Sequence, residues 1–166
     1  YTTSLVAEVN FNDLATQNVV VLDELKNINT AMENAVQVFV ENGGRVVVIP
    51  GETIDSRYYN RLLAKLGLPL LDSLADETLN VTDIAFDNPI YRDVFEKRVT
   101  NVDDPQSTRY YSIRGNAPQI LGYQNGNSFL LGENGRYLFT SPLSGDNSNF
   151  INSPLVVTTF YSIAWN

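Results

Sequence analysis

Residues 42–54 read NGGRVVVIPGETI, and the four apolar residues at the centre of this stretch, 46–49, decide the fold class. A continuous apolar run of mostly β-branched residues predicts a strand that is buried on both faces, and such strands are usually parallel and central. Glycines precede the run, and residues 50–52, Pro-Gly-Glu, follow it. Regular structure is therefore interrupted on both sides of the strand.

The segments around this strand predict an alternation of strands and helices. Residues 18–22, NVVVL, form a second continuous apolar run and predict a parallel neighbour. Residues 30–42 lie between the two strands and carry apolar side chains at helical spacing, with Thr30 and Glu33 in the pattern of a capping box. A second helix is expected after Asp55 or Ser56. Its apolar face is made of Tyr59, Leu62, Leu63 and Leu66, and Gly67 ends it.

The second half of the chain predicts mainly strands. Two Asn-Gly pairs, at 125-126 and 134-135, separate short apolar runs and predict hairpins. We therefore expect a three-stranded antiparallel meander at 119–123, 128–132 and 136–141. The remaining expected elements are short strands at 4–9, 79–84 (an edge strand) and 108–113, an irregular acidic segment at 70–77, a short helix from Pro89 to about Lys97, a loop at 103–105, a polar loop at 144–149 and a last helix from Pro154.

Composition excludes several classes of function. The chain has 166 residues and a formal net charge of −8, and its basic residues are scattered. Nucleic acids and anionic membrane surfaces are therefore not expected as partners. The sequence contains neither Cys nor His. This excludes disulfides, thiolate nucleophiles, Cys/His zinc sites and Ser-His-Asp triads. No apolar run approaches the roughly 18 residues that a membrane span needs.

Several motifs in order carry a resemblance to a known family. These motifs are VVVLDE at 19–24, FVENGGRVVVIPGE at 39–52, NPIYRDVF at 88–95 and GENGRYLFTSPLSGDNSNF at 132–150. In this order, and over nearly the whole chain, the sequence resembles the class I glutamine amidotransferase-like domain of BatA-like bacterial membrane proteins. The resemblance implies an α/β, flavodoxin-like, mostly parallel sheet flanked by helices, to which the C-terminal meander is added.

The resemblance also has implications for activity and location. Enzymes of this fold carry a nucleophilic Cys at the turn where Pro50 or Gly51 stands here, and a His later in the chain. Their absence implies that the domain is non-catalytic and needs no cofactor or metal. The resemblance further implies that residues 1–166 form one domain of a larger membrane-anchored protein and that this domain is periplasmic. Family members begin with a further strand–helix unit, which is then either missing here or replaced by the predicted strand 4–9.

The candidate site is a relic crevice at the strand ends, made of Asp23, Glu24, Pro50, Gly51 and Glu52. In open α/β sheets ligands gather where such strands end. One interpretation is that the amides of the turn bind an anion. Another is that Asp23 or Glu24 acts with Glu52 as paired carboxylates of a hydrolase. The simplest interpretation is an ordinary turn. If an elbow is retained, Gly51 should adopt a strained backbone conformation.

Two further groups of residues have functional interpretations. Residues 146–149, Asp-Asn-Ser-Asn, alternate oxygen ligands as a calcium loop does, although they lack the Gly and the closing Glu of an EF-hand. The pairs Tyr58-Tyr59 and Tyr110-Tyr111 could stack on sugars, but one tyrosine of each pair is expected to face the core.

We therefore expect a non-catalytic interaction module of a bacterial cell-envelope membrane protein, with a protein partner in the envelope. The alternative is a small-molecule or glycan receptor that uses the relic crevice. A carboxylate hydrolase is a third possibility.

Overall fold

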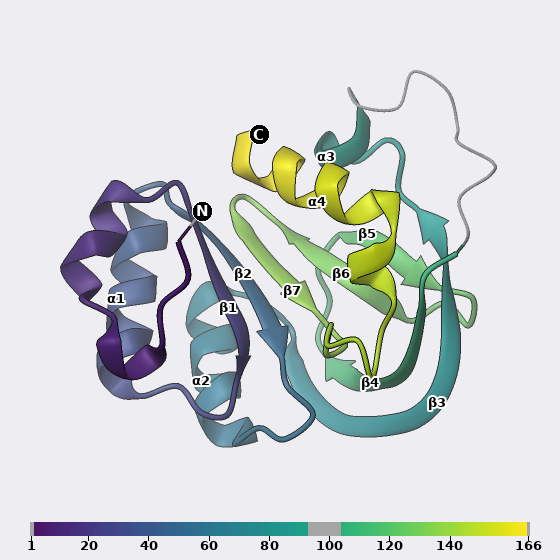
Figure 1. Cartoon of the computed structure of the whole chain (residues 1–166), viewed down its shortest axis with the longest axis horizontal. Coiled ribbons are helices and arrows are strands. Elements are labelled where there is room, and N and C mark those ends of the chain that lie inside the picture. The colour runs from purple at the N-terminus through teal and green to yellow at the C-terminus, as the bar shows by residue number, and fades with distance from the viewer. Residues whose placement is uncertain (1, 93–103, 166) are drawn as a thin grey trace.

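The computed structural model describes residues 2–92 and 104–165, which form one seven-stranded sheet with helices on both faces (Figure 1). The strands are β1 (Val19–Leu25), β2 (Arg45–Pro50), β3 (Leu70–Ile84), β4 (Gln106–Arg114), β5 (Gln119–Tyr123), β6 (Ser128–Glu133) and β7 (Arg136–Phe139). The helices are α1 (Thr30–Glu41), α2 (Ser56–Leu66), α3 (Pro89–Arg92) and α4 (Pro154–Trp165), with 3₁₀ turns η1 (Val6–Glu8), η2 (Phe11–Thr16) and η3 (Phe150–Asn152). The α/β class is thus as expected.

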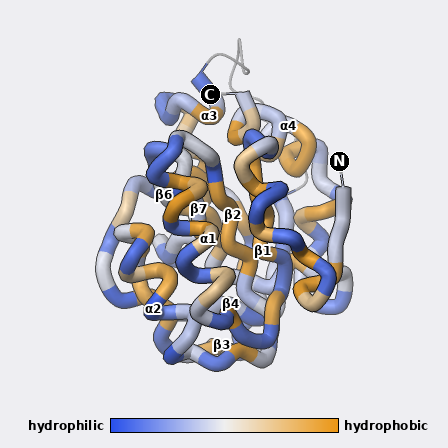
Figure 2. The backbone as a smooth tube through the Cα atoms, turned by 90° about the vertical axis from the view of Figure 1, so that its left-hand side faces the viewer, coloured by the Kyte–Doolittle hydropathy of each residue, from blue (hydrophilic) through white to orange (hydrophobic). Residues whose placement is uncertain are grey.

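The predicted core strand lies between two parallel neighbours. The sheet order is β1-β2-β7-β6-β5-β3-β4, and β2 pairs in parallel with both β1 and β7. Val46 and Val48 pack on one face of the sheet, and Val47 and Ile49 pack on the other. All four are at most 4% exposed, because helices cover both faces. Figure 2 shows these apolar strands between more polar outer elements.

The expectation of a mostly parallel sheet is wrong. The pairings β7-β6, β6-β5, β5-β3 and β3-β4 are all antiparallel, so parallel pairing is confined to β1, β2 and β7 among the described strands. The meander β5-β6-β7 is confirmed. It joins the sheet through β7, whose residues 136–138 pair with Val46–Val48 of β2. The Asn-Gly turn before β7 has a positive φ at both Asn134 and Gly135, which matches a hairpin of the primed type.

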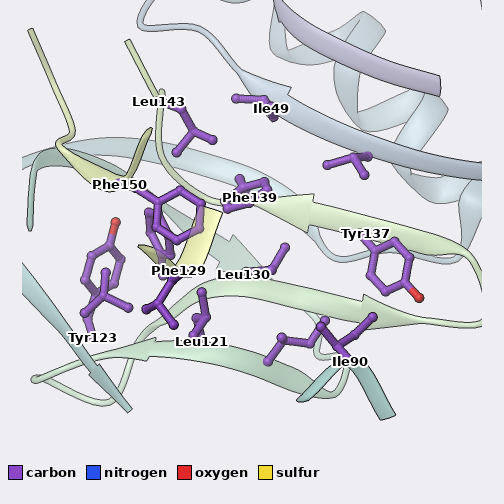
Figure 3. Packing of buried hydrophobic residues seen from close by; sticks show 14 of the residues in the cluster. Ile49, Ile90, Leu121, Tyr123, Phe129, Leu130, Tyr137, Phe139, Leu143 and Phe150 are labelled. Atoms are coloured by element: carbon purple, nitrogen blue, oxygen red, sulfur yellow. The ribbon is translucent and has the colours of Figure 1, made fainter. Parts of the chain in front are cut away.

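Two helix pairs bury the two faces of the sheet. Helices α1 and α2 cover one face, where Val36, Leu62 and Leu63 are fully buried. Helices α3 and α4 cover the other face, which is rich in aromatic side chains (Figure 3). The four residues predicted for the apolar face of α2 are all buried, Asp55 caps the helix, and Gly67 ends it in the left-handed conformation.

Helix α1 begins as expected but is capped differently. Asn29, not Thr30, is its N-cap, and the Asn29 side chain accepts a hydrogen bond from the Met32 amide. Glu33 is therefore not part of a capping box. It is buried and forms ion pairs with Arg61 and Lys65 of α2. The glutamate thus joins the two helices instead of closing the first turn of its own helix.

Three predictions in the less apolar segments are wrong. Residues 4–9 form no strand and contain the turn η1. Residues 70–77 are not irregular, because they form the first half of the long strand β3 and pair with β4. Residues 79–84 are not an edge strand, because β3 lies between β4 and β5. The part of the expected helix beyond Arg92 and the start of the loop at 103–105 lie outside the described residues.

Candidate functional site

The candidate crevice lies at the carboxyl ends of the parallel strands β1, β2 and β7. Leu25 at the end of β1 is level with Pro50 at the end of β2, and the pairing register shifts between Asp23 and Leu25. Glu24 occupies this shift with a φ of 48°, a left-handed conformation that costs a non-glycine residue energy. The structure therefore brings the candidate residues at the ends of β1 and β2 together, as expected from the sequence. The residue with the strained backbone is Glu24, not Gly51.

Gly51 does not form the expected strained elbow. Its φ lies outside the left-handed region, and the residue is buried against β1. A Cβ atom added to Gly51 would lie 3.3 Å from the Glu24 carbonyl oxygen, which is a tight contact. Glycine is therefore favoured here by the close approach of two backbones, and the strained conformation expected of Gly51 in a retained elbow is not observed.

The acidic side chains of the crevice have different surroundings. Glu24 Oε1 accepts a hydrogen bond of 2.7 Å from the Ser144 amide, in the segment that follows β7. Glu52 Oε2 accepts a 3.1 Å hydrogen bond from Arg109 Nη1 of β4, and Arg109 also lies 3.6 Å from Asp76. The Asp23 side chain is exposed. Glu24 and Glu52 thus each have a hydrogen-bond partner within the chain.

Two buried tyrosines hold the strand ends from within the molecule. The Tyr111 hydroxyl donates a 2.7 Å hydrogen bond to the Gly51 carbonyl oxygen, and the Tyr59 hydroxyl donates to the Leu25 carbonyl oxygen. Burial, and to a lesser degree the Glu52 charge, raises the pKa of Tyr111 to about 12. Burial is also the main reason why the pKa of Tyr59 is raised. Both hydroxyls therefore stay protonated and act as hydrogen-bond donors near neutral pH.

The tyrosine pairs are largely explained by packing. Tyr59 and Tyr111 face the core, as expected. Tyr110 is also buried, at 6% exposure, and its hydroxyl accepts hydrogen bonds from the side-chain amides of Asn125 and Asn127. Only Tyr58 among these four is substantially exposed, and its ring lies beneath the guanidinium groups of Arg57 and Arg61. Tyr110 and Tyr111 are both buried and therefore offer no exposed ring on which a sugar could stack.

Residues 146–149, for which a calcium loop was one interpretation, form hydrogen bonds within the protein through Asn147 and Ser148. Asn147 and Ser148 are buried. The Asn147 side-chain amide donates to the Arg109 and Pro142 carbonyl oxygens and to Ser141 Oγ, and its Oδ1 accepts from Thr108. No cluster of three or more acidic side chains suited to a metal ion exists among the described residues.

Two surface hollows lie away from the candidate residues. One, of about 520 Å³, is lined by the end of α2 and the β6–β7 turn, including Gly67, Glu133 and Arg136. A second, of about 290 Å³, lies between β4 and the β5–β6 turn. Neither is lined by Asp23, Glu24, Pro50, Gly51 or Glu52. Within the described part of the chain, no helix is both long and apolar enough to cross a membrane.

Sequence reasoning found Glu24 and Glu52 but missed the residues that engage them. Arg109, Tyr111 and Ser144 come from distant parts of the chain, and each contact spans more than fifty residues. Arg109 and Tyr111 lie on β4, whose position at the far edge of the sheet has no local sequence signal. The pair Tyr110-Tyr111 can be recognised in the sequence, but the sequence does not indicate that the Tyr111 hydroxyl donates to the Gly51 carbonyl oxygen.

Comparison with known proteins shows similarity at the level of the fold. No family model matches the sequence, and no curated protein does. A putative ThuA-like protein from Bacteroides uniformis ATCC 8492 is similar with a TM-score of 0.64 and 13% identity, over 97% of this chain and 75% of that one. The mmIFT52 N-terminal domain is similar with a TM-score of 0.58 and 14% identity, over 97% of this chain and 84% of that one.

A β-galactosidase from the psychrophilic Marinomonas ef1 is also similar, with a TM-score of 0.60 and 15% identity. The similarity covers 88% of this chain but only 20% of the β-galactosidase. At these identities the likeness shows the fold alone. The ThuA-like neighbour supports a glutamine amidotransferase-like fold only distantly.

Proposed function

We propose that the chain is a non-catalytic, amidotransferase-like interaction module of a bacterial cell-envelope membrane protein, and that it acts in the periplasm. The main observation in support of a non-catalytic role is that polar groups at the ends of β1 and β2 form hydrogen bonds with other parts of the chain. Glu24 is bonded to Ser144, Glu52 to Arg109, and the Gly51 carbonyl oxygen to Tyr111. The chain also contains no Cys or His that could serve as a nucleophile or a general base. The envelope location rests on the resemblance to BatA-like proteins.

The exposed face of α4 supports an interaction role. Val157, Tyr161 and Trp165 are 72%, 63% and 73% exposed and are spaced by four residues, so they form one stripe along the helix. The rings of Tyr161 and Trp165 lie 6.0 Å apart, centroid to centroid. Contiguous exposed apolar side chains, and aromatic ones above all, are typical of protein interfaces.

Charge indicates which kind of partner suits this stripe. Residues 147–166 contain no Asp, Glu, Lys or Arg, although the whole chain carries a net charge of −8. Electrostatic attraction therefore contributes little at α4, and the partner should present an apolar, uncharged protein surface. Binding through this stripe should be nearly insensitive to salt, because only charged contacts are screened.

A site-specific cross-link in the intact parent protein tests this proposal. A photo-reactive phenylalanine analogue at Tyr161 should capture one defined envelope protein in intact cells. The same analogue at Val38, an exposed apolar position on α1, serves as the matched control and should capture none. An identical set of products at both positions would exclude α4 as the specific interface.

The receptor function stays an alternative proposal. A ligand at the crevice would compete with the Ser144 amide for Glu24 and with Arg109 for Glu52. A ligand that uses the crevice would raise the melting temperature of the protein, and Glu52→Gln would remove this increase.

A further inference from the structure

The larger of the two surface hollows lies between the end of α2 and the β6–β7 hairpin. Its volume of about 520 Å³ is within the range of small-molecule sites, and residues 116–118 of the β4–β5 loop form a further wall. The hollow lies at the amino end of β7, where Arg136 begins the strand. It is therefore separate from the candidate crevice, which lies at the carboxyl ends of the parallel strands.

Two side chains of opposite charge lie on one face of the sheet at this hollow. Glu133 at the end of β6 and Arg136 at the start of β7 are directly opposite in the register of the hairpin. Because side chains alternate along a strand, Glu133 lies on the same face as Leu131. Arg136 lies on the same face as Leu138 for the same reason. Both leucines pack in the cluster beneath α1 and α2, so the two charged side chains lie on the side of the sheet where α2 ends.

Neither of these charged side chains has a partner in the part of the chain that the structure describes. Glu133 and Arg136 form no ion pair or side-chain hydrogen bond there, although they are cross-strand neighbours. The arginines at 57, 61, 109 and 114, by contrast, each form an ion pair with a carboxylate. The two charges at the hollow are thus available to a ligand.

The end of α2 adds free acceptors to the wall. Leu66 and Gly67 line the hollow, and their carbonyl oxygens accept no backbone hydrogen bond from a described residue. Carbonyl oxygens in the last turn of a helix lack partners within the helix and give this end a partial negative charge. A positively charged group is therefore favoured on the α2 side.

The backbone fixes the shape of the hollow. The Gly132 amide donates a 2.9 Å hydrogen bond to the Pro118 carbonyl oxygen, which ties the β4–β5 loop to the hairpin. Gly132 has a φ of 131°, and a Cβ atom there would lie 2.1 Å from the Arg136 carbonyl oxygen, so only glycine fits. Preformed walls lower the cost of ordering a site when a ligand binds.

The charges decide which class of ligand matches the hollow. A simple anion would be repelled by Glu133, and a simple cation by Arg136. A molecule with both an ammonium and a carboxylate group can pair each charge with its opposite. Residues opposite each other in an antiparallel pair have Cα atoms only about 4.5–5.5 Å apart. The ligand should therefore carry its two charges close together, as an amino acid does and as the distant ends of a peptide do not.

We propose that this hollow is a binding site for a free α-amino acid. The Arg136 guanidinium binds the carboxylate of the ligand. The Glu133 carboxylate and the carbonyl oxygens at the end of α2 bind its ammonium group. The inference does not depend on the proposed function, because its residues belong neither to the candidate crevice nor to the stripe on α4.

Calorimetric titration of the purified chain with the common L-α-amino acids, one at a time, tests the site. At least one of them should bind with a Kd of about 1 mM or tighter. Arg136→Gln and Glu133→Gln should each weaken this binding by about tenfold or more, because each removes a charge-assisted contact. Arg57→Gln and Glu41→Gln are the matched controls outside the hollow and should bind as wild type does.

Derivatives of the ligand give a test that does not depend on the folding of any variant. The N-acetyl derivative of the bound amino acid lacks the ammonium charge, and its amide lacks the carboxylate charge. Each should bind the wild-type chain about tenfold more weakly or worse. A derivative that binds as tightly as its parent would overturn the proposal.

Two further results would also overturn it. A wild-type chain that binds none of the amino acids at millimolar concentration would show that Glu133 and Arg136 are only exposed charges of the hairpin. Binding that either of the two glutamine substitutions in the hollow leaves unchanged would place the ligand elsewhere on the molecule.

Discussion

The Tyr111 hydroxyl donates a 2.7 Å hydrogen bond to the carbonyl oxygen of Gly51, and this contact joins β4 to the end of β2 across the molecule. The two residues are sixty positions apart in sequence. Gly51 is buried, so its carbonyl oxygen cannot turn to water for a partner. The contact thus stabilises the turn that follows the central parallel strand β2.

Tyr111→Phe should lower the free energy of unfolding by about 1–3 kcal/mol, because a buried carbonyl oxygen is left without its donor. Urea unfolding followed by circular dichroism measures this change. Tyr58→Phe is the control, since Tyr58 is 37% exposed, and it should change stability by less than about 0.5 kcal/mol. Equal effects of the two substitutions would show that the Tyr111 bond contributes nothing specific.

Replacement of Glu24 should separate backbone strain from side-chain bonding. Glu24→Ala and Glu24→Gly both remove the carboxylate that accepts the Ser144 amide, but only glycine relieves the positive φ of 48°. Glu24→Gly should therefore be more stable than Glu24→Ala by about 1 kcal/mol. Paired urea titrations give this difference, and an alanine variant as stable as the glycine variant would argue against the left-handed conformation.

Gly51→Val should destabilise the protein more than Gly51→Ala, because the branched side chain would press against β1. The alanine Cβ alone would lie 3.3 Å from the Glu24 carbonyl oxygen, a distance that small shifts can accommodate. We expect about 1 kcal/mol for alanine and up to about 3 kcal/mol for valine. Thermal unfolding of both variants tests the order, and a valine variant as stable as wild type would contradict the close approach of the two backbones.

Acid should weaken the contact between α1 and α2. Burial raises the pKa of Glu33, but hydrogen bonds from Lys65 and Arg61 lower it by a larger amount. The pKa of Glu33 therefore lies below the ordinary value of 4.5. A carboxyl whose pKa is lower in the folded state contributes stability above its unfolded pKa and loses it as pH falls through the folded value. The stability advantage of wild type over Glu33→Gln should therefore be full near pH 6 and shrink below about pH 4.5.

Unfolding free energies measured at pH 6 and at successively lower pH test this dependence. At pH 6 the Glu33→Gln substitution should cost about 1–3 kcal/mol. Arg61 and Lys65 are 44% and 34% exposed, so they can be hydrated once the carboxylate is gone, which limits the cost. A difference between the two proteins that is constant with pH would mean that the ion pairs do not contribute.

Much of the fold could be predicted from sequence because its signals are local. The continuous apolar runs of β1 and β2, the helical spacing in α2 and the Asn-Gly turns each specify their own segment. Strand β3 was missed at residues 70–77 because its pairing partners Tyr110 and Tyr111 lie far along the chain. The acidic side chains there are exposed on a strand whose backbone is paired.

The sheet direction and the site were predicted only in part for the same reason. A buried apolar strand looks alike whether its neighbours are parallel or antiparallel, so β2 gave no information about β5, β6 and β3. The candidate carboxylates could be found because they follow predicted strands. Their partners Arg109 and Ser144 could not, because these contacts exist only after β4 and the segment beyond β7 have been placed.

The absence of amidotransferase chemistry is the central claim, and glutamine hydrolysis measures it most directly. Ammonia release from glutamine should be followed with the purified chain and with Glu52→Gln as the matched variant. We predict no release above the protein-free background for either protein, because the chain has no Cys or His and because Glu24 and Glu52 are hydrogen-bonded within the chain. Turnover by the wild-type chain that Glu52→Gln abolishes would contradict the account.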